Sequence, residues 1–170
     1  MEPYYESMKQ IAAETSAEVV LLGGNYDDSV TPPRFFEKYI LPPLREYAEA
    51  LHARGKYLMT HTDGENRRLM PLYRQAGFDI ADSLCPAPMT RMTLDEIRAA
   101  LGDRVTIWGG IPSVLLCEDS ASEEHFRTWI DALVERYGHQ SHFVLGVSDM
   151  VTADVSWERL AYVTEKIACL

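Results

Sequence analysis

Residues 56–65 have the sequence KYLMTHTDGE, in which a short apolar run ends at a histidine and polar residues follow. Such a run is typical of a buried parallel strand, and the polar residues after it are typical of a loop at the strand's carboxyl end. Apolar residues at helical spacing come next and end at Gly77, a residue type that favours a helix C-terminus. Residues 56–77 therefore predict one strand–helix unit.

The same unit recurs along the chain. Short apolar runs lie at 18–24, 78–82, 105–108 and 142–146, and helical patterns at 35–51, 93–101, 126–137 and 157–167. A shorter helical pattern at 5–11 precedes the first run, and 93–96 and 120–123 both have the sequence of a capping box. Strand–helix alternation with right-handed crossovers predicts an α/β protein in which helices flank a parallel sheet of about five strands.

Length and composition favour one cored domain over residues 1–170. The chain has 170 residues, of which 46% are hydrophobic, and its 16 Lys+Arg and 26 Asp+Glu give a net charge of −10. An acidic surface repels phosphates, so neither nucleic acid nor a membrane is expected as a partner. No apolar run is long enough to span a bilayer, the start lacks a secretory pattern, and the three cysteines are scattered. We expect a cytoplasmic protein.

Two architectures fit five strand–helix units. A doubly wound open sheet of this length would be complete by itself, whereas a TIM barrel has eight strands, so five units would form only part of one. Composition does not decide between them. Both architectures place functional residues at the carboxyl ends of the strands.

Polar and acidic residues follow all five predicted strands, which favours an enzyme over the alternative that loops are simply polar. These residues are Asn25, Tyr26, Asp27, Asp28, His61, Asp63, Glu65, Asp82, Ser83, Cys85, Gly109, Gly110, Ser148 and Asp149.

His61 and Asp63 are the strongest candidates, because residues two apart in an extended chain share a face. They could bind Zn²⁺ together, or the carboxylate could orient the imidazole; the alternative is a histidine that is only hydrogen-bonded at a strand end. Cys85 is a further candidate ligand, or else a small buried apolar residue. Gly109 and Gly110 could admit a substrate close to the backbone, or form a tight turn.

Several motifs in order resemble the C-terminal half of the uroporphyrinogen decarboxylase superfamily. They are the 25–28 loop and the stretches at 35–42, 61–64, 77–79, 101–105, 108–112, 146–149 and 157–160. The resemblance covers nearly the whole chain and implies a partial TIM (β/α)8 barrel of about five βα units. It also implies that the N-terminal half of the barrel is absent here.

The superfamily contains two main chemistries. Its decarboxylases act on a porphyrinogen and usually carry a Gly-His-Gly histidine on the last strand, where this chain has Gly146-Val147-Ser148-Asp149. Its corrinoid-dependent methyltransferases bind zinc through His-x-Cys and a later cysteine, and here these places hold His61-Thr62-Asp63 and, at or near the last one, Ser148. A His/Asp ligand set is harder and richer in oxygen than a His/Cys set, but it can still bind zinc.

The resemblance therefore implies a methyltransferase that moves a methyl group between a small molecule and a corrinoid protein, with zinc as a candidate cofactor. The alternatives are a decarboxylase acting on a porphyrinogen or another small acid, and a truncated, non-catalytic half-barrel. Bare sheet edges also predict a homodimer or pairing with a missing half of the barrel. The expected roles are catalytic for His61, Asp63 and Asp149; metal-binding for His61, Asp63 and Cys85; and substrate-binding for Asn25, Tyr26, Asp28, Glu65, Gly109, Gly110 and Ser148.

Overall fold

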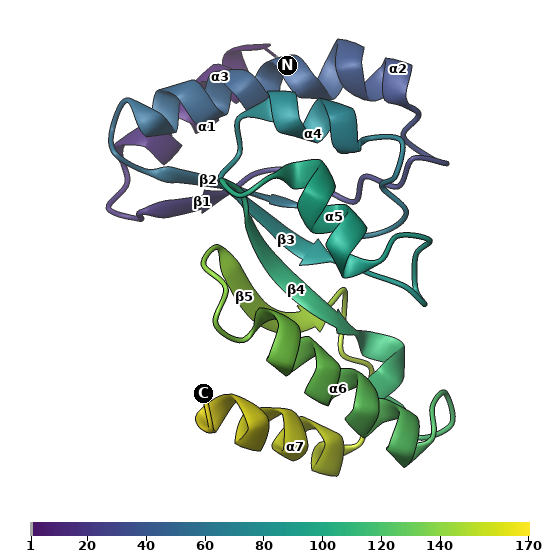
Figure 1. The fold of residues 1–170 in the computed structure, drawn as a ribbon. Helices are drawn as coiled ribbons and strands as arrows, with labels where there is room; N and C mark the ends of the chain where they lie inside the picture. The colour runs from purple at the N-terminus through teal and green to yellow at the C-terminus, as the bar shows by residue number, and fades with distance from the viewer. Residues whose placement is uncertain (1) are drawn as a thin grey trace.

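The computed structural model describes residues 2–170, which form one curved parallel sheet with helices along its outer side (Figure 1). Within that range no helix is long and apolar enough to cross a membrane. The five strands lie side by side in chain order, each parallel to the next. They are β1 (Val19–Leu21), β2 (Tyr57–His61), β3 (Ile80–Leu84), β4 (Thr106–Pro112) and β5 (Phe143–Ser148).

Helices connect successive strands and also begin and end the described chain. Short π-helical (η1) and 3₁₀ (η2) segments join them. In order they are α1 (Glu2–Glu14), α2 (Pro33–Phe35), η1 (Phe36–Ile40), α3 (Leu41–His52), α4 (Met70–Ala76), α5 (Leu94–Leu101), η2 (Ser113–Leu116), α6 (Glu123–Tyr137) and α7 (Trp157–Ala168).

The strand order decides between the two predicted architectures. A doubly wound sheet reverses its order at a switch point, whereas the strands of a TIM barrel follow one another in sequence. The observed order, β1-β2-β3-β4-β5, has no reversal. The α/β fold and its assignment as part of a TIM barrel are therefore confirmed.

The core lies between the sheet and the helices. Leu58, Ala81 and Ile107 occupy the helix-facing side of the three central strands, and none of them is exposed. Above β2, rings pack edge to face: Phe36 lies 5.3 Å from Tyr26 between centroids. Burial of these side chains holds the outer layer to the sheet.

The opposite, inner face of the sheet carries several apolar side chains that are partly exposed. Leu21 pairs with Met59 in register, and Trp108 pairs with Val144, so these side chains share the face away from the helices. Leu21 is 53% exposed, Trp108 42% and Val144 40%. Among the described strands, β1 pairs only with β2 and β5 only with β4, which leaves one open edge at each end of the sheet.

One of the two predicted capping boxes is confirmed. Thr93 caps α5: its hydroxyl accepts from the Glu96 N–H at 3.2 Å, and the Glu96 carboxylate accepts from the Thr93 N–H at 2.8 Å. The box predicted at 120–123 is wrong, because α6 begins later and Ser122 is its N-cap, accepting from the His125 N–H. Ser122 caps the helix without a capping box, because the residue three positions later is His125.

The long helix predicted at 35–51 is interrupted near its start. The Leu41 N–H bonds to the Phe36 carbonyl, five residues earlier, in a π-helical segment. Pro42 and Pro43 follow directly and have no N–H to donate to that turn. The widened turn is therefore where the backbone accommodates two successive prolines.

The apolar inner face and the two open edges predict self-association. Leu21→Lys places a charge on the inner face at the β1 edge and should lower the sedimentation-average mass of the concentrated protein. Val30→Lys is a matched control, because Val30 is 81% exposed in a loop. A wild-type chain that stays cleanly monomeric at high concentration would contradict the prediction.

Candidate functional site

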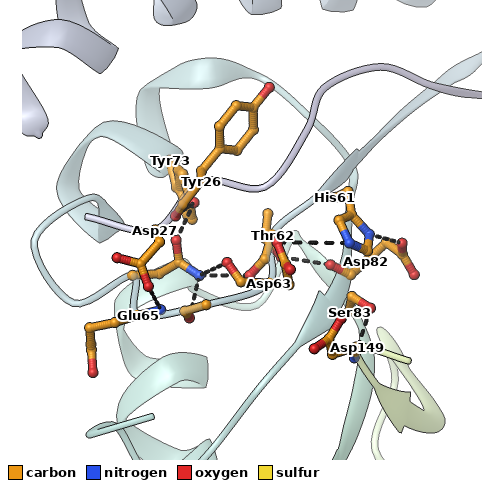
Figure 2. Close-up of polar contacts among 12 residues, drawn as sticks. Tyr26, Asp27, His61, Thr62, Asp63, Glu65, Tyr73, Asp82, Ser83 and Asp149 are labelled. Atoms are coloured by element: carbon orange, nitrogen blue, oxygen red, sulfur yellow. Dashed lines mark hydrogen bonds and ion pairs between the residues drawn. The ribbon is translucent and has the colours of Figure 1, made fainter. Parts of the chain in front are cut away.

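The site begins with a pair of neighbours on β2 and β3. Parallel pairing sets His61 beside Asp82, so both side chains project from the inner face. Their side chains meet at 2.8 Å between His61 Nδ1 and Asp82 Oδ2 (Figure 2). A carboxylate can only accept, so Nδ1 carries the proton and Nε2 of the neutral ring is left with its lone pair.

Asp63 lies on the other side of the imidazole. Its Oδ1 is 3.8 Å from His61 Nε2, and the residue is 8% exposed. That oxygen is buried and accepts no hydrogen bond. Burial raises the pKa of Asp63, the neighbouring His61 opposes the shift, and the Asp149 carboxylate adds to it. An orphaned carboxylate oxygen in this position is suited to receive a proton or a cation from a ligand.

Asn66 fixes the loop that carries Asp63. Its amide nitrogen donates to the backbone carbonyls of Thr62 at 2.6 Å, Gly64 at 2.9 Å and Asp63 at 3.1 Å. Its carbonyl oxygen accepts from the Tyr73 hydroxyl at 2.5 Å, which ties the loop to α4. The buried amide thus satisfies the polar backbone of a tight turn at the end of β2.

The acidic residues predicted to bind substrate from the 25–28 and 61–65 loops form hydrogen bonds between loops. The Asp28 carboxylate accepts from the Arg68 N–H at 2.9 Å. Glu65 accepts from the Arg91 N–H at 2.8 Å, and its own N–H donates to Asp27 at 3.0 Å. Hydrogen bonds from Ser29 and then Glu65 lower the pKa of Asp27. These contacts hold three strand-end loops together, so ligand binding by Asp28 and Glu65 stays a prediction.

Tyr26 and Asn25, which are neighbours in the sequence, lie in different environments. Tyr26 is buried and packs against the rings of Phe36 in η1 and Tyr73 in α4, whereas Asn25 is exposed on the loop after β1. Tyr26 therefore stabilises the loop after β1 by packing in the core. Contact of either residue with a ligand stays a prediction.

Ser148 and the glycine pair form a packed junction of β3, β4 and β5. The Ser148 hydroxyl donates to the Leu84 carbonyl at 2.5 Å and accepts from the Gly110 N–H at 3.0 Å. Gly109 has φ +143°, and a Cβ there would lie 2.8 Å from the Leu84 carbonyl oxygen. The structure therefore gives these residues a packing role, and their predicted contact with substrate is untested.

Two non-glycine residues at the carboxyl ends of β3 and β5 have left-handed backbones. Ser83 has φ 63° and Asp149 has φ 61°, and the Asp149 N–H donates to the Ser83 hydroxyl at 3.0 Å. This conformation is costly for residues other than glycine, and it persists where surrounding contacts impose it. The exposed Asp149 carboxylate is thereby held near the His61–Asp63 pair (Figure 2).

The predicted zinc ligands are only partly brought together. Among residues 2–170, no three His, Cys, Asp or Glu side chains are placed to hold a metal ion. Cys85 is buried with its sulfur 3.6 Å from Met89, and burial raises the pKa of its thiol to about 11. Zinc prefers three or four protein ligands and a deprotonated thiol. His61 and Asp63 supply two ligands, so the described residues do not by themselves fit a zinc centre.

With this geometry in place, comparison with known proteins identifies the class. The family model described as uroporphyrinogen decarboxylase (URO-D) matches residues 5–168, nearly the whole chain. The chain therefore belongs to the uroporphyrinogen decarboxylase family. A comparison with curated proteins found no match.

Sequence reasoning missed the partnership of His61 with Asp82 and the role of Asn66. Asp82 ends its apolar run as His61 ends the preceding one, so equal positions on neighbouring parallel strands could have indicated the pair. Asn66 offers no comparable signal, because its three acceptors are defined only once the turn has folded.

Asn66→Ala should lower the free energy of unfolding by about 2–3 kcal/mol, since it leaves buried carbonyls without their donor and removes the short hydrogen bond of the Tyr73 hydroxyl. Urea denaturation measures the change. Asn25→Ala removes the same amide from an exposed position and should change stability by less than about 0.5 kcal/mol. Equal effects of the two variants would contradict the assigned role.

Asp63→Asn should stabilise the fold at neutral pH. A carboxyl whose pKa is raised by folding binds its proton more tightly in the folded state, so ionising it destabilises the fold as pH rises above the ordinary value of 3.8. The variant's advantage should therefore vanish below that pH and grow above it. Denaturation curves across this range measure it, with exposed Asp103→Asn as control. A variant less stable than the wild type at neutral pH would refute the argument.

Proposed function

We propose that this chain acts as a methyltransferase of the uroporphyrinogen decarboxylase family, which moves a methyl group from a small molecule to a corrinoid protein. The supporting observation is the pair of His61 and Asp63, with an unsatisfied carboxylate oxygen 3.8 Å from the imidazole. By the sequence resemblance, the pair corresponds to the His-x-Cys motif of the methyltransferase branch. Asp82 adds a fixed partner for the imidazole.

The corrinoid of the partner protein would supply the electron pair that accepts the methyl group. The bond between the methyl carbon and the leaving atom breaks, and the leaving atom keeps the electrons. Asp63 would protonate that atom, because its raised pKa makes its carboxyl a better proton holder than an exposed one, and His61 Nε2 would take up and return the proton. Asp82 would keep His61 Nε2 directed to the reacting group.

The charge of the site favours methyl transfer over porphyrinogen decarboxylation. A porphyrinogen carries several carboxylates, and these need cationic partners. The site instead gathers the carboxylates of Asp63, Asp82 and Asp149 around one histidine. The last strand ends in Val147-Ser148-Asp149 and lacks the histidine usual in decarboxylases.

His61→Gln should slow methyl transfer by about 10²–10⁴-fold, the usual effect of losing a general acid or polarising group. The assay follows methylcobalamin formation from free cob(I)alamin, with a methyl ether, a methyl thioether and a methylated amine as donors. His52→Gln is the matched control, because His52 is exposed and bonded to Asp79 at the other end of the sheet.

Full activity of the His61→Gln protein, or no transfer from any donor by the wild type, would overturn the proposal. Metal analysis separates the two modes of activation. One equivalent of zinc that is lost in His61→Ala would mean that further ligands come from outside the described residues. Transfer without bound zinc would indicate that the His61–Asp63 pair activates the donor without a metal.

A further inference from the structure

A second cleft lies at the amino end of the sheet, at the other end of the strands from the candidate site. It forms where α4 and α5 end and the chain turns into β3 and β4 (Figure 1), and its volume is about 510 Å³. Its lining includes the buried residues Tyr73, Phe78 and Leu101 and the exposed residues Arg74 and Arg104. Cavities of this size commonly hold small molecules, so the cleft has room for more than a single ion.

The two arginines of the cleft have no partner in the protein. Neither the Arg74 nor the Arg104 guanidinium forms an ion pair or a hydrogen bond within residues 2–170. They are also not needed at the helix ends, whose last carbonyls attract cations. Arg45 donates to the Gln75 carbonyl at the end of α4, and Arg98 donates to two carbonyls after α5 at 3.0 and 2.7 Å. Both guanidinium groups of the cleft are therefore available to a ligand.

The two carboxylates in the lining are engaged by other groups. The Asp79 carboxylate meets His52 Nε2 at 2.9 Å and accepts from the Leu58 N–H at 2.8 Å. Asp103 lies near Arg98, since burial lowers the pKa of Arg98 and the Asp103 carboxylate opposes that shift. These acidic side chains therefore do not neutralise the two arginines of the cleft.

Backbone donors at the cleft also lack acceptors. The N–H groups of Phe78, Asp103 and Arg104 form no hydrogen bond within residues 2–170, and Phe78 is only 4% exposed. A buried backbone N–H needs an acceptor from water or from a ligand. Guanidinium and backbone N–H groups both donate to oxyanions, and a phosphoryl group offers more acceptor oxygens than a carboxylate. The donors of the cleft therefore match a phosphoryl group.

We propose that this cleft binds a small phosphate ester, with the phosphoryl group at Arg74 and Arg104 and the organic part against Tyr73, Phe78 and Leu101. The net charge of −10 repels anions from the chain at long range, so binding depends on the local donors of the cleft. The ligand is held and not transformed, because no bond of the ester is made or broken in this proposal. The site is separate from the proposed methyl transfer and does not rest on it.

Titration calorimetry with phenyl phosphate in Tris chloride tests the site, with benzoate as a carboxylate of similar shape and phenol as a neutral probe. We expect phenyl phosphate to bind, and the other two compounds to bind about tenfold or more weakly. Arg74→Gln and Arg104→Gln should each weaken binding of phenyl phosphate by about tenfold. Arg34→Gln is the matched control, because Arg34 is exposed on α2, follows the carboxyl end of β1 and should not affect binding.

Equal binding of phenyl phosphate and phenol, or unchanged binding by the Arg74→Gln and Arg104→Gln proteins, would overturn the inference. Benzoate binding as tight as that of phenyl phosphate would overturn the choice of a phosphoryl group. Both arginines are exposed, so we expect the urea midpoints of the two variants to match the wild type, which separates lost binding from lost folding. Methyl transfer is assayed separately, and failure of either proposal leaves the other standing.

Discussion

The register between β2 and β3 is the constraint on which the candidate site depends. It sets His61 opposite Asp82, and the hydrogen bond of 2.8 Å between them directs the free ring nitrogen to Asp63. A slip of one residue would turn one partner to the helix side, because successive side chains of a strand alternate between faces. The fully buried helix-facing side chains of Leu58 and Ala81 oppose such a slip, since it would move them out of the core.

Much of the polar chemistry at the strand ends maintains the geometry of this small centre. Asn66 holds the turn after β2, and Glu65 links that turn to the loops after β1 and β3. Because Asn66 and Glu65 form their hydrogen bonds with backbone groups, they are not free to bind a ligand, and few other polar side chains at the strand ends are. Asp63 is the clearest exception, and its unmet hydrogen bond is the kind of local conflict expected at functional sites.

The alternation of strands and helices could be predicted because each apolar run is bounded by glycine, proline or a cap. Strand order required the structure, since local periodicity does not say which strands are neighbours. Within the site, the proximity of His61 and Asp63 followed from spacing along one strand end. The hydrogen bonds of Asp28 and Glu65 could not be predicted in this way, because their partners Arg68 and Arg91 each lie on the loop after the next strand. A loop carboxylate is equally suited to a ligand and to a backbone N–H.

The open edges of the sheet also determine the symmetry of any edge-to-edge assembly. All five strands are parallel and in chain order, so the edge at β1 differs from the edge at β5. Where the sheet continues in parallel from copy to copy, the β5 edge of one copy joins the β1 edge of the next, which is a heterologous contact, whereas two like edges would pair antiparallel and close as a dimer. Heterologous contacts close into a ring when the curvature brings the last edge back to the first, and otherwise continue as a filament. The curvature of a single sheet thus decides between a finite particle and a fibre.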